Sequence, residues 1–206
     1  MSRISADDKS PFSIWIGVII LLGAGAGVWW FFNQAEPEMD PSGKPYLKIV
    51  PTDAVLKKRL NDSQYNVTRK NGTETAFQNL YWNNFTPGIY ADVITGEPLF
   101  SSLDKFEGNT GRPCFSKPFA EGIIAETPDT SHDMVRTRLH AIRSNSHLGH
   151  LFADGPPPTG KRYAVNSAAL KFIPIERFEE LGYAEFLPLF SSTPAPPGAP
   201  AASPAK

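Results

Sequence analysis

Residues 144–175, SNSHLGHLFADGPPPTGKRYAVNSAALKFIPI, carry the pattern that decides the fold. They contain two short β-like runs, HLGHLF at 147–152 and ALKFIPI at 169–175, on either side of a segment rich in Gly and Pro. Three similar runs lie upstream: GIYADVI at 88–94, EGIIAE at 121–126 and DMVRTRL at 133–139. Short apolar runs separated by turn residues are typical of antiparallel sheets. We therefore predict a mainly β fold with long loops.

Helices are expected to be few and short. The stretch TDAVLKKRL at 52–60 begins with Thr52 and Asp53, which are good capping residues, and predicts a helix of about two turns. A second short helix is predicted at 175–182, IERFEELG, with Phe178 and Leu181 facing inward and Gly182 as the stop signal.

The N-terminal region predicts a membrane anchor. Residues 12–32, FSIWIGVIILLGAGAGVWWFF, contain no charge, and about 20 such residues span a bilayer as a helix. Trp15, Trp29 and Trp30 lie near the ends of this span, where aromatic rings favour the interface. A cleaved signal peptide is the alternative, but it has a shorter apolar region followed by small residues. Gly23 and Gly27 have the spacing of a helix–helix contact, which is also common by chance.

The rest of the chain divides around this span. Residues 1–11 form a short tail, which we expect on the cytoplasmic side of the membrane. We expect the bulk of the chain on the non-cytoplasmic side. We predict a linker at 33–48, one folded domain at 49–190 and a Pro/Ala-rich tail at 191–206.

Composition excludes several classes of function. Twenty Lys and Arg against 21 Asp and Glu give a net charge of −1, which argues against a nucleic-acid partner. A single cysteine, Cys114, excludes an intrachain disulfide and a Cys-rich zinc site.

Several segments between residues 60 and 187 resemble one family in collinear order. They are YNVTRKNGTETAF, YWNNFTPGIYADVITGEPLFSSLDKFEGNTGRP, SHDMVRTRL and SNSHLGHLFADGPPPTGKRYAVNSAALKFIP. Together they resemble the B-type methionine-R-sulfoxide reductases. The resemblance implies two small antiparallel sheets with a few short helices. In this chain they follow the transmembrane helix predicted at residues 12–32. It also implies reduction of the R epimer of methionine sulfoxide, free or in a peptide or protein, by an enzyme thiol and an external thiol reductant.

The nucleophile of this family is a cysteine in a run like R-Y-C-x-N-S-A. Here the run has Ala164 at that position, and a methyl group cannot attack the sulfoxide sulfur or form a sulfenic acid. The resemblance assigns the rest of the site to His147 and His150, which deliver the proton, with Asp154, Arg162 and Asn166 nearby.

The substrate methyl group is bound in this family by a tryptophan in a G-W-P-S-F loop. This chain has Arg112 there, with Phe115 as a further substrate-binding residue and Thr110 at the position of the resolving cysteine in many members. Cys114 replaces the serine of that loop. It is either an alternative nucleophile, with the Arg112 guanidinium favouring the thiolate, or a small buried residue.

The zinc-binding cysteine pairs of some members are absent, because residues 92–95 and 131–134 read DVIT and SHDM. We therefore expect the zinc-free form, with no metal and no cofactor.

Three hypotheses follow. The first is a catalytically impaired, membrane-anchored domain with a recognition or structural role, such as a subunit of a membrane complex bound through the span. The second is an active peptide-methionine-R-sulfoxide reductase that uses Cys114. The third is an active enzyme in which Ala164 is an engineered substitution, although Arg112 argues against it.

Overall fold

The computed structural model describes residues 43–44, 46–131 and 134–191. The predicted tail at 1–11, the predicted span at 12–32, residues 33–42 and 45 of the linker and residues 192–206 lie outside this part of the chain. Within it, no helix is long and apolar enough to cross a membrane.

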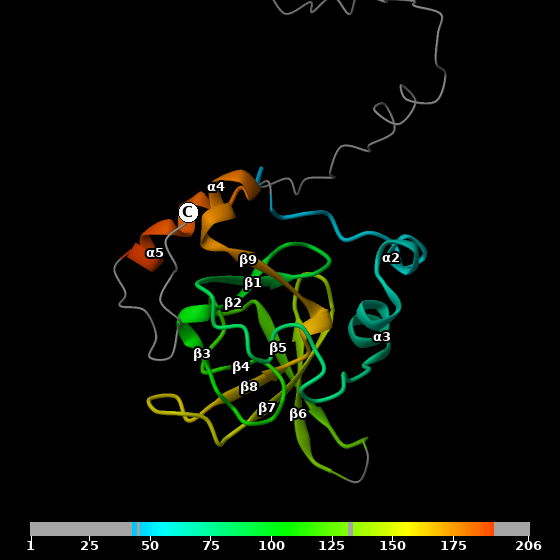
Figure 1. The fold of residues 1–206 in the computed structure, drawn as a ribbon. Helices are drawn as coiled ribbons and strands as arrows, with labels where there is room; N and C mark the ends of the chain where they lie inside the picture. The colour runs from blue at the N-terminus through cyan, green and yellow to red at the C-terminus, as the bar shows by residue number, and fades with distance from the viewer. Residues whose placement is uncertain (1–42, 45, 132–133, 192–206) are drawn as a thin grey trace, which may run out of the picture. The chain divides into compact units, whose positions relative to one another are not determined.

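Two antiparallel sheets form the domain, as predicted (Figure 1). The three-stranded sheet has the order β2-β1-β9. The six-stranded sheet has the order β3-β4-β8-β7-β6-β5. The strands in chain order are β1 Gly88–Asp92, β2 Pro98–Ser101, β3 Lys105–Phe106, β4 Cys114–Phe115, β5 Ile124–Asp129, β6 Arg136–Ala141, β7 His147–Phe152, β8 Arg162–Val165 and β9 Leu170–Pro174.

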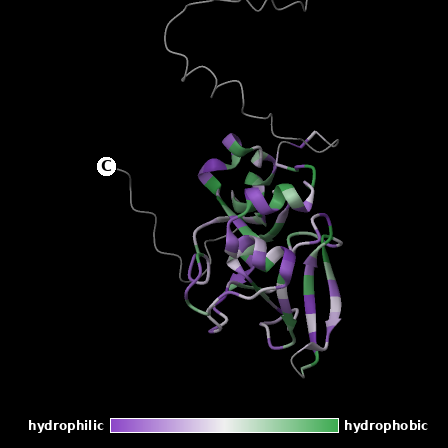
Figure 2. Ribbon diagram, turned by 90° about the vertical axis from the view of Figure 1, so that its right-hand side faces the viewer, coloured by the Kyte–Doolittle hydropathy of each residue, from purple (hydrophilic) through white to green (hydrophobic). Residues whose placement is uncertain are grey.

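The main core lies between the two sheets. Successive residues of a strand point to opposite faces, and Figure 2 shows hydrophobic and hydrophilic residues alternating along the strands. Tyr90 of β1 and Phe100 of β2 meet Phe115 of β4 there, with the Phe100 and Phe115 rings stacked at 4.4 Å. The opposite face of β1 and β9 packs against the C-terminal helices, where Phe178 is fully buried.

The two predicted helices are present. The first is α2 Asp53–Arg59, and the second consists of η4 Ile175–Arg177 followed by α4 Phe178–Leu181. Gly182 ends α4 with a φ of 81°, a left-handed conformation that suits glycine. The remaining helical elements are α3 Asp62–Lys70, η1 Ser102–Asp104, η3 Ser167–Ala169, η5 Ala184–Phe186 and α5 Leu187–Ser191.

Helix α3 was not predicted, although its N-terminus carries a readable signal. The side chain of Asn61 accepts a hydrogen bond from the Gln64 backbone N–H, and the Gln64 side chain accepts one from the Asn61 N–H. This reciprocal pair is a capping box. It was missed because its residues are mostly polar and show no apolar periodicity.

The packed part of the domain begins before residue 49, so the predicted linker is too long at its C-terminal end. Tyr46 and Leu47 are buried against the C-terminal helices, and the Tyr46 ring stacks on Tyr183 with centroids 4.5 Å apart. The breakers at 41–45 directed the prediction away from these two apolar residues.

Candidate functional site

Three residues of the predicted site lie in one row across the six-stranded sheet. Ala164 of β8 is directly opposite Cys114 of β4 on one side and His150 of β7 on the other. Directly opposed residues of antiparallel strands share a face, with side chains about 5 Å apart. The row therefore brings the alanine methyl, the thiol and an imidazole together on the face opposite the core.

A β-bulge brings His147 to the same face as His150. Residues three apart in a regular strand point to opposite sides, but the pairing of β6 with β7 shifts between Leu139 and His140, and Leu148 is the extra residue. The His147 and His150 ring centroids are consequently 5.7 Å apart. Gly149 follows the bulge, and a Cβ there would lie 2.1 Å from the Ala164 carbonyl oxygen, so only glycine fits.

The imidazoles of this site are predominantly neutral at neutral pH. His147 is 1% exposed, and burial together with neighbouring histidines lowers its pKa to about 4. Burial also lowers the pKa of His150, although a carboxylate partner opposes this effect. A neutral imidazole has one N–H donor and one acceptor nitrogen, so each ring can donate only one hydrogen bond.

Asp129 is a site residue that the sequence reasoning missed. Its carboxylate is 2.8 Å from His150 Nε2 and 2.7 Å from the Arg138 guanidinium, and its side chain is 2% exposed. The hydrogen bond with His150, followed by bonds with Ser131, holds the pKa of Asp129 far below its ordinary range. As an ionised acceptor, Asp129 requires the His150 proton on Nε2 and thereby fixes the imidazole's orientation. The missed signal was the final carboxylate of β5, which lies 21 residues from His150.

Arg162 and Asp154, two of the predicted site residues, form a bidentate pair. Arg162 Nε and Nη2 donate to the two Asp154 carboxylate oxygens at 2.8 and 2.9 Å. The pair raises the pKa of Arg162 and lowers that of Asp154. The Arg162 guanidinium also lies 4.2 Å from the Phe152 ring centroid, so its position is held from two sides.

The remaining predicted residues hold loops in place. Asn166 donates to the Leu148 carbonyl at 3.0 Å and accepts from the Glu74 N–H at 3.1 Å. Arg112 donates to the Glu74 carbonyl oxygen at 2.7 Å. Glu74 therefore ties the loop that carries Arg112 to the end of β8.

The predicted substrate contact of Phe115 is wrong. Phe115 is fully buried in the main core, because it follows Cys114 on β4 and points to the opposite face.

Cys114 lies on the site face but is covered. It has no exposed surface, and its Sγ is 3.4 Å from Thr110 Oγ1. A Cβ on Gly108 would lie 2.4 Å from Sγ, so the 107–113 loop packs directly on the thiol. The guanidinium of Arg112 donates to the Glu74 carbonyl oxygen. Of the two interpretations of Cys114, the structure therefore favours a small buried residue over an alternative nucleophile.

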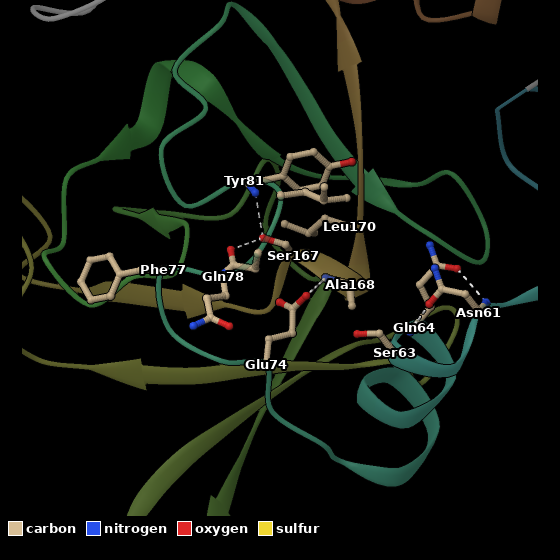
Figure 3. A pocket seen from close by; sticks show the side chains of 12 residues that line it. Asn61, Ser63, Gln64, Glu74, Phe77, Gln78, Tyr81, Ser167, Ala168 and Leu170 are labelled. Atoms are coloured by element: carbon tan, nitrogen blue, oxygen red, sulfur yellow. Dashed lines mark hydrogen bonds between the residues drawn. The ribbon is translucent and has the colours of Figure 1, made fainter.

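A cavity of about 420 Å³ is lined by residues of α3, of the 74–81 segment and of the 167–170 segment (Figure 3). Glu74 lines it and accepts a hydrogen bond from the Ala168 N–H at 3.0 Å, and Tyr81 and Leu170 form its apolar wall. None of the sequence-predicted site residues lines this cavity. The row of Cys114, Ala164 and His150 and this cavity are thus separate features.

The described residues hold no group of three or more His, Cys, Asp or Glu side chains that could bind a metal ion. Asp92, at one position of the absent cysteine pairs, instead accepts a hydrogen bond from the Ile94 N–H at 2.7 Å within a turn.

Comparison with known proteins identifies the family. The family model of the SelR domain matches residues 60–174. This chain belongs to the SelR family. Two SelR relatives carry the name peptide methionine sulfoxide reductase MsrB. The one from Staphylococcus saprophyticus is 53% identical over 135 residues, which are 65% of this chain and 95% of the relative. The one from Staphylococcus haemolyticus is 51% identical over 135 residues, with the same coverage.

The SelR match covers both sheets from α3 to the end of β9. It therefore includes the row of Cys114, Ala164 and His150, the Asp154–Arg162 pair and Asp129. The predicted span at 12–32 and the Pro/Ala-rich tail lie outside the matched residues.

Proposed function

We propose that this chain is a membrane-anchored SelR protein that binds methionine R-sulfoxide in peptides or proteins and does not reduce it. The observation that carries the proposal is Ala164, which lies between Cys114 and His150 at the centre of the site face.

Sulfoxide reduction by a thiol needs an accessible sulfur. The thiolate attacks the sulfoxide sulfur, the oxygen passes to the enzyme as a sulfenic acid, and the thioether is released; two external thiols then restore the enzyme thiol and form a disulfide and water. Ala164 offers a methyl group at this step. The covered thiol of Cys114 takes its place only if the loop packed on it through Gly108 moves away.

The groups that recognise a sulfoxide are retained. A sulfoxide oxygen is a hydrogen-bond acceptor. The Arg162 guanidinium, held by Asp154, is a fixed donor on the site face, and the neutral imidazole of His147 lies on the same face. Because these donors do not depend on a thiol, binding and reduction are separable in this chain.

The predicted span at 12–32 suggests where the domain acts. A charge-free segment of this length keeps the domain at a membrane, with the domain on the non-cytoplasmic side, where oxidised methionines of membrane or secreted proteins are its ligands. The spacing of Gly23 and Gly27 supports a helix contact with a membrane-protein partner.

The test is a comparison of binding and turnover on the full chain in mild detergent. We expect calorimetry to detect binding of a peptide with methionine R-sulfoxide, weaker binding of the S epimer, and dithiothreitol-dependent reduction at background. Rapid reduction that is lost in the Cys114→Ser variant would establish the second hypothesis, an active enzyme using Cys114. Absence of any sulfoxide binding would leave only a structural role.

A further inference from the structure

We propose that a basic and apolar surface around the start of the domain binds anionic phospholipid headgroups and holds the domain against the membrane. The proposal rests on the anchor of the proposed function and adds a second, independent contact. The surface, called the Lys48 surface below, consists of Lys48, Ile49, Val50, Val55, Arg59 and Lys171.

The three cations of the Lys48 surface gather around one turn. The Lys48 backbone N–H donates to the Thr95 carbonyl, and α2 packs against Ile94 of the same turn. Lys171 is exposed on β9, opposite Ala91 just before this turn. Burial lowers the pKa of Lys48, and the positive charges of Arg59 and Lys171 lower it further, as expected for cations held close together.

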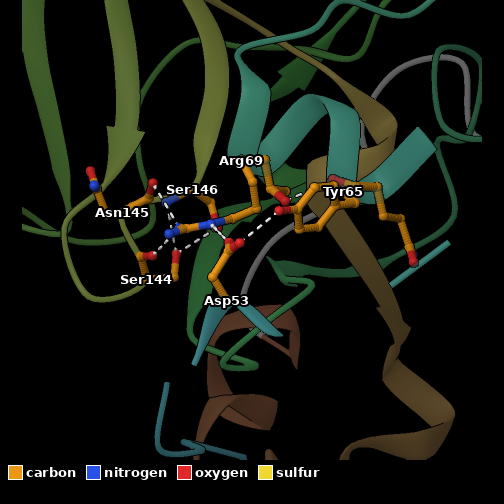
Figure 4. Close-up of polar contacts among 8 residues, drawn as sticks. Asp53, Tyr65, Arg69, Ser144, Asn145 and Ser146 are labelled. Carbon is orange, nitrogen blue, oxygen red and sulfur yellow. Dashed lines mark hydrogen bonds and ion pairs between the residues drawn. The ribbon is translucent and has the colours of Figure 1, made fainter. Parts of the chain in front are cut away.

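These cations have no ion-pair partner in the described part of the chain. The acidic residue of α2, Asp53, is engaged elsewhere: Tyr65 donates to it at 2.7 Å and Arg69 at 3.4 Å (Figure 4). Arg69 also donates to the Ser144 carbonyl at 3.1 Å, which ties α3 to the β6–β7 turn. Lys57 and Lys58 of α2 are exposed and add to the positive field. The positive charge is therefore carried on a fixed scaffold.

Apolar side chains accompany this charge. Ile49 is 47% exposed, Val50 37% and Val55 47%. Scattered exposed hydrophobic residues are common, but these three share one short segment with Lys48 and Arg59. Cations that meet lipid phosphates beside apolar groups that enter the headgroup region are the features of a surface that lies on a membrane.

The length of the connecting chain makes this contact geometrically possible. Only residues 33–42 separate the predicted span from Gly43, and ten residues reach at most about 35 Å when fully extended. The Lys48 surface begins five residues after Gly43 along the chain. The anchor therefore raises the local concentration of lipid at this surface, so weak electrostatic contacts suffice.

The experiment is amide hydrogen exchange of residues 47–60 on the full chain in nanodiscs. One set contains phosphatidylcholine alone, and the other contains equal parts of phosphatidylcholine and phosphatidylglycerol. We expect slower exchange in the anionic nanodiscs at low salt, with the difference lost at high salt. Each cation near an anionic surface contributes about fivefold to the equilibrium constant for membrane contact. Reversing the charge of all three cations should therefore remove the difference in hydrogen exchange between the two kinds of nanodisc.

The test variant is Lys48→Glu, Arg59→Glu and Lys171→Glu combined. The matched control is Lys117→Glu, Lys161→Glu and Arg177→Glu, which makes the same change of net charge at cations that lie near carboxylates elsewhere on the domain. The control retains the lipid-dependent protection if the surface is specific. Equal exchange of the wild-type chain in both nanodiscs overturns the Lys48 surface alone, whereas failure of the chain to insert at all overturns the anchor with it. Equal loss in the test and control variants also overturns the proposal, because net charge alone then explains the contact.

Discussion

The two faces of the six-stranded sheet differ in what they keep. On the core face, Phe115, Tyr163 and Val165 are buried and complete an apolar layer against the second sheet. On the opposite face, the same two strands carry Cys114 and Ala164. Cys114 and Ala164 do not belong to the main core, so a substitution on the site face leaves the core residues of these strands in place. The fold therefore depends on one face of β4 and β8, whereas the proposed sulfoxide site lies on the other face.

The largest effect should come from placing a thiol at position 164 together with an aromatic side chain at position 112. We expect Ala164→Cys to give little dithiothreitol-dependent reduction of methionine R-sulfoxide, because Arg112 still occupies the place of an aromatic wall. The double variant Ala164→Cys/Arg112→Trp should be faster than the two changes predict separately, since nucleophile and pocket act on one bound substrate. Removal of a covalent nucleophile costs up to about 10⁶ in rate, which sets the range available for recovery. Full activity from Ala164→Cys alone would show that Arg112 does not limit the site.

A substitution on the core face should act on stability instead. Phe115→Ala removes a ring that stacks on Phe100 in the main core, and such changes cost about 3–5 kcal/mol of the free energy of unfolding. The control is Phe77→Ala, because Phe77 is 55% exposed. Urea denaturation measures both. A loss of less than about 1 kcal/mol in Phe115→Ala would contradict the division between the faces.

His147, on the site face, makes the free energy of unfolding depend on pH. His147 has a pKa of about 4 in the folded protein against 6.5 when unfolded, so the unfolded chain binds the proton more tightly. The contribution of His147 to the free energy of unfolding is fully present above pH 6.5. As the pH falls from 6.5 to 4, about 3 kcal/mol of this contribution is lost. Unfolding free energies of the wild type and His147→Asn across this range should converge as the pH falls. Parallel curves would mean that another group titrates.

The smallest effect should come from Cys114→Ala. Loss of one buried sulfur costs about 1 kcal/mol of the free energy of unfolding. The covered thiol should contribute nothing to turnover in the Ala164→Cys/Arg112→Trp background. Denaturation and the reduction assay on the paired variants check this. A strong fall in turnover would show that Cys114 acts as a second thiol rather than as packing.

Local sequence patterns predicted the mainly antiparallel fold, the two short helices at 52–60 and 175–182 and the family. Those features depend on local patterns: runs such as HLGHLF, the glycine that ends α4, and motifs read in order along the chain. The predicted span and its orientation stay predictions, because they lie outside the described residues. Apolar periodicity did not reveal α3, because the helix is mostly polar and only its capping box marks it.

The assembly of the site depends on contacts between segments far apart in the sequence. A bulge in β7 places His147 beside His150, although their spacing in a regular strand would separate them. The structure also brings Asp129 to His150 across 21 residues of sequence and turns Phe115 into the core. The physical reason is that strand register and side-chain face depend on pairing between segments far apart in the chain, and a shift of one residue reverses which face a side chain occupies.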